Sequence, residues 1–136
     1  MSPEAELLQA LRAGTGDIRH HGAWLDLFLG LAQSRIDALC QTLRDWQVQS
    51  PDQPLPFAAL TQADELAGLC AEQPSDSLAE LSALLAQALR RVSAQSASEA
   101  QRQALTQAGD ELMRQLHQHA AGVRVVTPPH MLTALR

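Results

Sequence analysis

Histidine pairs are the first residues in this chain that suggest chemistry, because imidazoles at helical spacing bind transition metals. His117 and His119 lie two positions apart, and His20 and His21 are adjacent. On a helix, such neighbours point to different faces, whereas helical ligand pairs use spacings of three or four residues. The spacing therefore argues against a metal site, and we expect neither a metal nor a cofactor.

The spacing of the carboxylates and cysteines indicates structural roles rather than catalysis. Asp110 and Glu111 stand four and three residues before Arg114, the pattern of ion pairs on a helix surface. Cys40 and Cys70 have apolar neighbours at helical spacing, where a free cysteine acts as a small hydrophobic residue. The sequence contains no glycine-rich phosphate loop and no nucleophile motif. We therefore predict a protein without enzymatic activity.

The composition predicts a helical and acidic protein. The chain has 136 residues, of which 46% are hydrophobic and only 3% aromatic, so its core must consist mainly of Leu and Ala. Both are strong helix formers. The net charge is −5 at pH 7, and the only adjacent cations are Arg90 and Arg91. This distribution disfavours a nucleic acid as partner, because binding phosphates requires clustered positive charge.

The apolar segments are too short and the N-terminus too acidic for export or membrane insertion. Residues 1–6 lack the positive and apolar segments of a secretory signal. The longest apolar stretch, residues 23–32, is interrupted by Asp26 and Gly30, and it is about half as long as a membrane-spanning helix. We therefore expect a cytoplasmic protein with no transmembrane segment.

An apolar ladder over residues 18–46 is the strongest structural signal. Its steps alternate between four and three residues, which keeps the members on one side of a slightly supercoiled helix. We expect this helix to span residues 17–47, with Thr15 or Asp17 as its cap. The members of the ladder are Ile18, Gly22, Leu25, Leu29, Ala32, Ile36, Leu39, Leu43 and Trp46.

Two shorter helices are expected, one before the first long helix and one after the loop that follows it. Pro3 at a first helical position predicts a helix over residues 3–13. Three prolines within residues 50–56 predict a loop, because they remove backbone donors. Thr61 then serves as the N-cap of a helix over residues 61–72.

A second long helix is expected over residues 77–121. Its apolar spacing thins to alanine and polar residues over 93–103 and then resumes. One continuous helix fits this pattern, and so do two helices if a capping box of Ser96 and Glu99 starts the second. We favour the continuous helix.

The predicted fold is all-α, an antiparallel helical bundle with two long helices and shorter flanking helices. Residues 1–122 form its single domain, and residues 123–136 form an extended C-terminal tail. A ladder of this length, with only one comparable internal partner, is also compatible with a homo-oligomer.

A second apolar stripe lies beside the ladder on the first long helix. Together with the ladder it makes residues 24–31 apolar on most of their circumference, so another surface must cover them. Either the N-terminal helix covers the stripe with its leucines, which we favour, or the stripe is exposed and docks on an apolar surface or a partner. The stripe consists of Trp24, Leu27, Phe28 and Leu31, and the leucines are Leu7, Leu8 and Leu11.

This arrangement resembles that of the phasins, bacterial proteins that coat polyhydroxyalkanoate storage granules. The likeness covers about residues 24–112. It rests on a long first helix with WLDLFLGLA at 24–32, a short helix with LTQADELAGL at 60–69, and a helix rich in Ala, Leu, Ser and Gln that includes VSAQSASE at 92–99. The chain departs from the family pattern in having no lysine-rich tail.

The resemblance implies a helical coat or interaction protein rather than an enzyme. Its amphipathic helix face, with Trp24, Leu27, Phe28 and Leu31, would bind the apolar granule surface. The alternative is a helical adaptor or secretion chaperone, in which the same stripe binds one protein partner.

Overall fold

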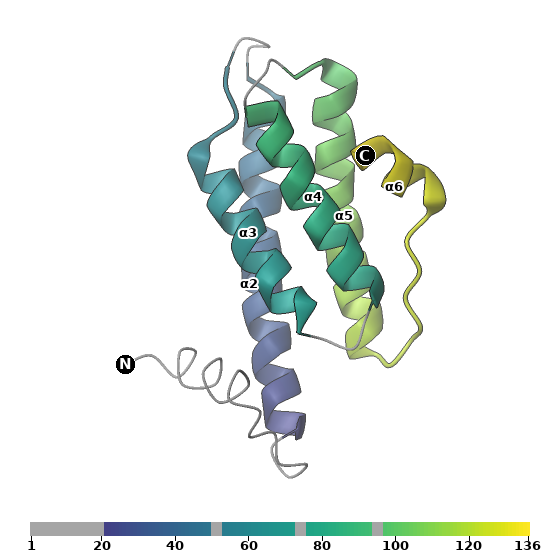
Figure 1. Ribbon diagram of the computed structural model, residues 1–136. Helices are drawn as coiled ribbons and strands as arrows, with labels where there is room; N and C mark the ends of the chain where they lie inside the picture. The colour runs from purple at the N-terminus through teal and green to yellow at the C-terminus, as the bar shows by residue number, and fades with distance from the viewer. Residues whose placement is uncertain (1–20, 50–52, 73–75, 94–96) are drawn as a thin grey trace. The chain divides into compact units, whose positions relative to one another are not determined.

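The computed structural model describes residues 21–49, 53–72, 76–93 and 97–136. Within these ranges all regular secondary structure is α-helical and no strand is present, which confirms the all-α prediction for this part of the chain (Figure 1). The helices are α2 (His21–Gln47), α3 (Phe57–Ala71), α4 (Asp76–Ser93), α5 (Glu99–Ala120) and α6 (Pro129–Leu135).

The chain divides into two compact units, residues 1–31 and 32–136, and the boundary falls within α2. The predicted end of the first long helix is confirmed, because α2 ends at Gln47. The predicted helix over 3–13 and the first four residues of the helix predicted over 17–47 lie outside the described residues.

Ladder residues of α2 supply much of the core in the second unit. Ala32, Ile36, Leu39 and Leu43 are fully buried, and Trp46 is 1% exposed. Burying a large apolar side chain contributes about 1.5–3 kcal/mol to stability. The ladder spacing therefore identified the buried face of this part of α2.

The helices of the second unit are connected by apolar packing and by ion pairs. α3 packs on α4, α4 packs on α5, and α6 packs on both α4 and α5. From α2, Arg35 Nε lies 2.8 Å from Glu65 Oε2 on α3, and Arg44 Nη2 lies 2.6 Å from Asp110 Oδ1 on α5. Exposed ion pairs add little stability, so these pairs mainly restrict which helix surfaces meet.

α3 begins four residues before the predicted start. The prediction placed Thr61 at the N-cap, but Pro56 is the N-cap and Phe57 is the first helical residue. Proline at a helix start costs nothing, because it has no backbone N–H to leave without a partner. Thr61 consequently lies inside α3, and the helix ends at Ala71, close to the predicted end.

The continuous helix predicted over 77–121 is wrong, and the two-helix alternative is correct. A capping box starts α5, although it uses Ser98 and Gln101 rather than Ser96 and Glu99. The Ser98 hydroxyl accepts from the Gln101 N–H at 3.1 Å, and Gln101 Oε1 accepts from the Ser98 N–H at 2.8 Å. These reciprocal bonds satisfy two backbone donors at the start of α5, and the alanine- and serine-rich stretch has little apolar surface with which to favour continuity.

The predicted extended tail over 123–136 is helical in its second half. α6 follows Pro128, with Pro129 at its first position, where a fixed φ and a missing donor are tolerated. Leu135 of α6 is only 2% exposed. The extended tail is therefore wrong for residues 129–135, where Pro128 and Pro129 start a helix.

Gly109 allows α5 to approach α2 closely. A Cβ atom on Gly109 would lie 3.0 Å from Cys40 Sγ and 3.8 Å from Leu43 Cδ1. A Cβ atom on Gly68, in the interior of α3, would meet no atom within 4 Å. Helix propensity favours alanine at both positions, but steric repulsion opposes it only at Gly109.

Gly68→Ala should raise the free energy of unfolding by about 0.5–1 kcal/mol, because glycine disfavours a helix interior. Gly109→Ala should not raise the free energy of unfolding in this way, because its Cβ atom is crowded against Cys40. Adding Cys40→Ala to the same chain should restore the stabilisation by alanine at position 109. Urea denaturation of the four variants in the Gly109 and Cys40 cycle measures the coupling, which we expect to be about 1 kcal/mol. Equal gains at Gly68 and Gly109 in the otherwise unchanged chain would contradict the close contact.

Candidate functional site

The apolar stripe predicted from the sequence lies on the part of α2 that belongs to the first unit. Phe28 is fully buried, Leu31 is 6% exposed and Leu27 is partly buried. The side chain of Trp24, and the three leucines expected to cover the stripe, lie outside the described residues. A binding role for the stripe therefore requires Phe28 and Leu31 to become uncovered.

Among the described residues, four large apolar side chains are exposed. Val48 and Phe57, at 85% and 79% exposure, flank the loop between α2 and α3. Val123 and Val126, at 52% and 64%, share the segment between α5 and α6. Single exposed apolar residues are normal in folded proteins, but the two valines recur within one short segment without regular structure.

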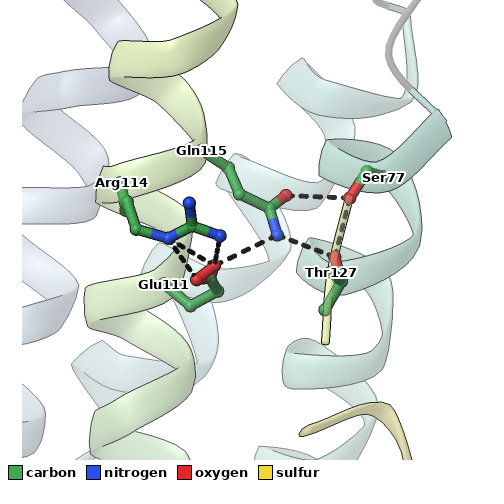
Figure 2. A network of polar contacts seen from close by, with 5 residues as sticks. All are labelled: Ser77, Glu111, Arg114, Gln115 and Thr127. Atoms are coloured by element: carbon green, nitrogen blue, oxygen red, sulfur yellow. Dashed lines mark hydrogen bonds and ion pairs between the residues drawn. The ribbon is translucent and has the colours of Figure 1, made fainter. Parts of the chain in front are cut away.

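A polar network joins α4, α5 and the segment before α6 (Figure 2). Its centre is Gln115, which is fully buried. Gln115 Nε2 donates to Thr127 Oγ1 at 2.7 Å, and Gln115 Oε1 accepts from Ser77 Oγ at 3.0 Å. The hydroxyl oxygens of Ser77 and Thr127 lie 2.7 Å apart. Because buried polar groups are costly without partners, these bonds hold Thr127 on α4 and α5.

Glu111 and Arg114 extend this network toward solvent (Figure 2). Glu111 is 8% exposed, and its carboxylate accepts several hydrogen bonds from the Arg114 guanidinium. These bonds raise the pKa of Arg114 above its usual value. The pair predicted between Asp110 and Arg114 is wrong: Asp110 binds Arg44 of α2, while Arg114 binds the carboxylate three residues before it.

Arg102 connects the end of α2 with the start of α5. It is 4% exposed, and its guanidinium carbon lies 4.7 Å from the centroid of the Trp46 ring. Its Nη1 donates to the carbonyl oxygens of Trp46 and Gln49 at 3.3 and 3.4 Å, and its Nη2 donates to that of Gln53 at 3.3 Å. Trp46 Nε1 donates to the same Gln53 oxygen at 3.1 Å. One buried cation thus donates to the last turn of α2 and to the residues that follow it.

Sequence reasoning missed Arg102, Gln115 and Thr127. Arg102 is one of ten dispersed arginines, and no local pattern distinguishes it. The one available signal was Trp46, because a buried indole N–H needs an acceptor and its ring attracts a cation. Gln115 and Thr127 lie twelve positions apart, with a helix end between them.

The residues considered for metal binding do not assemble in the described part of the chain. There, no three side chains of His, Cys, Asp or Glu lie together so that they could hold a metal ion. His117 is exposed and His119 is partly buried. The side chains of His20 and His21 lie outside the described residues.

Cys40 and Cys70 are core residues, as predicted. Both are free, at 4% and 0% exposure. Burial raises the pKa of each thiol to about 11. Asp110 adds to the rise at Cys40, whereas a hydrogen bond with Ser82 partly offsets it at Cys70. The thiols are therefore protonated near neutral pH and are poor nucleophiles.

No family model, curated protein or solved structure matches the chain. Among the described residues, no helix combines the length and the apolar character needed to cross a membrane. The chain itself offers two candidate functional surfaces: the stripe on α2, and the surface of α4 and α5 to which the C-terminal segment is bound.

The raised pKa values of the two thiols predict a loss of stability in alkaline solution. Between pH 9 and 11 the unfolded thiols lose their protons while the folded thiols keep them, so unfolding releases protons and becomes more favourable. The free energy of unfolding should fall by up to about 1.4 kcal/mol per pH unit for each thiol.

This measurement is unusually clean, because the chain has neither lysine nor tyrosine to titrate in the same range. Urea denaturation from pH 8 to 11 should show the decrease, and Cys40→Ala with Cys70→Ala should remove it. An equal decrease in the double variant would show that the thiols are not its cause.

Proposed function

We propose that this protein is a non-enzymatic, cytoplasmic coat protein that binds the apolar surface of polyhydroxyalkanoate granules, as phasins do. The supporting observation is that α2 carries more apolar surface than its ladder needs. The ladder residues from Ala32 to Trp46 fill the core of the second unit, and the stripe of Trp24, Leu27, Phe28 and Leu31 is additional to it.

The proposed mechanism is burial of the stripe against the polyester. Each side chain that leaves water for an apolar surface contributes about 1.5–3 kcal/mol. Exposed Asp, Glu, Arg and Gln side chains on the other helix faces would remain in water and keep coated particles apart. Because Phe28 and Leu31 are buried, binding has to uncover them. The division of the chain after Leu31 supports uncovering that leaves residues 32–136 folded.

We further infer that the helices form an antiparallel bundle, the architecture predicted from the sequence. Trp46 near the end of α2 contacts Arg102 near the start of α5. Cys40, earlier in α2, faces Gly109, later in α5. These pairs support opposite directions for α2 and α5.

Partitioning onto polyester particles tests the proposed function. Trp24→Asp with Leu27→Asp places two charges on the stripe and avoids Phe28, whose replacement would disturb a buried position. The double variant should bind at least about tenfold less protein per particle, because about 1.4 kcal/mol corresponds to a factor of ten. Circular dichroism should show that it remains helical.

Val48→Asp is the matched control. It replaces an apolar side chain just beyond α2, which is already 85% exposed, with a charged one. The control should partition like the unchanged protein. Unchanged partitioning of the double variant would refute the role of the stripe. A complex of fixed stoichiometry with one protein, and no binding to particles, would instead support the adaptor or chaperone alternative.

A further inference from the structure

The C-terminal helix is bound through a small set of contacts. α6 has seven residues and packs on α4 and α5, but Leu135 is its only buried side chain. Arg91 donates a hydrogen bond to the carbonyl oxygen of Leu135, and Arg136 Nη2 lies 3.6 Å from Glu80 Oε1. A helix this short does not form stably by itself in water. Its structure therefore depends on the surface that α4 and α5 provide.

That surface is not completely filled by α6. A pocket of about 170 Å³ lies between the three helices. Its apolar lining includes Val92 of α4, Leu105 of α5 and Ala134 of α6. Incomplete packing forfeits dispersion contacts, so α6 separates from α4 and α5 at a lower cost than a tightly packed helix would.

The segment between α5 and α6 has the features of a hinge. It starts at Gly122, whose φ of +75° turns the chain after α5. Residues 123–128 have no regular secondary structure. The segment is rich in valine, which favours strands, and Val123 and Val126 are exposed. Its only strongly held side chain is Thr127, in the polar network with Ser77 and Gln115 (Figure 2).

We propose that two copies of this chain form a dimer by exchanging residues 123–136, so that α6 of each copy binds α4 and α5 of the other. The partner is a second copy because the surface on α4 and α5 already accepts α6, and every copy presents the same surface and the same helix. Exchange requires only a change at the hinge, and it recreates each contact of α6 between copies.

Exchange also covers the exposed valines. In a two-fold dimer the two hinge segments run antiparallel beside each other, and paired strands satisfy backbone groups while valines pack across them. Val123 and Val126, half or more exposed in the single chain, then gain a partner. The polar network is retained, with Thr127 of one copy bound to Ser77 and Gln115 of the other.

The distance between Ser77 and Thr127 provides a direct test. Their hydroxyl oxygens lie 2.7 Å apart and face each other (Figure 2), so cysteines at both positions can form a disulfide. One full-length chain carries Ser77→Cys, and a second, with a different tag, carries Thr127→Cys. The two chains are expressed together and purified under oxidising conditions. We expect a covalent heterodimer in which mass spectrometry identifies the link between positions 77 and 127.

A chain with both substitutions is the positive control, because it reports whether the disulfide forms at all. If the double chain is oxidised internally while the paired single chains yield no heterodimer, exchange is refuted. Dimers that lack the link between positions 77 and 127 refute it as well.

A surface variant tests the role of the hinge valines. Val123→Lys with Val126→Lys should raise the dissociation constant of the dimer about tenfold, because like charges then face each other across the paired segments. Light scattering over a concentration series measures this constant. Val48→Lys, at another exposed valine, should leave it unchanged. An unchanged constant in the double variant would overturn the pairing of the hinge segments.

Discussion

The guanidinium of Arg102 lies against the Trp46 ring and donates to three backbone carbonyl groups between residues 46 and 53. Removing a cation from water is costly unless its donors are satisfied. The last carbonyl groups of a helix likewise need donors from outside the helix. The interaction therefore connects the last turn of α2, and the residues that follow it, to the start of α5.

The division of the chain relates this interaction to the proposed function. From Ala32 onward, the ladder on α2 is buried, and ion pairs, the Arg102 contacts and the polar network around Gln115 connect the helices. The stripe proposed to bind granules belongs to the other unit. A protein that binds a surface by uncovering one helix face needs a second part that stays folded, and residues 32–136 have the required core.

The sequence predicted the features that depend on local spacing. The ladder gave the buried face of α2 from Ala32 to Trp46 and the end of the helix, and the apolar neighbours of Cys40 and Cys70 indicated core positions. Features that depend on distant partners were missed. The order of the C-terminal segment, for example, depends on Thr127 meeting Gln115. The break before α5 depends on a local pair, Ser98 and Gln101, but the spacing of this stretch also fits a continuous helix. The prolines gave no sign of the helices that follow them, although Pro56 precedes the first residue of α3 and Pro129 is the first residue of α6.

A double-mutant cycle on Arg102 and Trp46 tests the central claim most directly. Arg102→Met should lower the free energy of unfolding by about 2–3 kcal/mol, because the ring loses its cation and three carbonyl groups each lose the hydrogen bond from the guanidinium. Arg90→Met, which removes only an exposed ion pair with Asp64, should cost less than about 1 kcal/mol. With Trp46→Leu completing the cycle, we predict a coupling of about 1 kcal/mol or more between Arg102 and Trp46. Equal costs for the two arginine variants and no coupling would contradict the account.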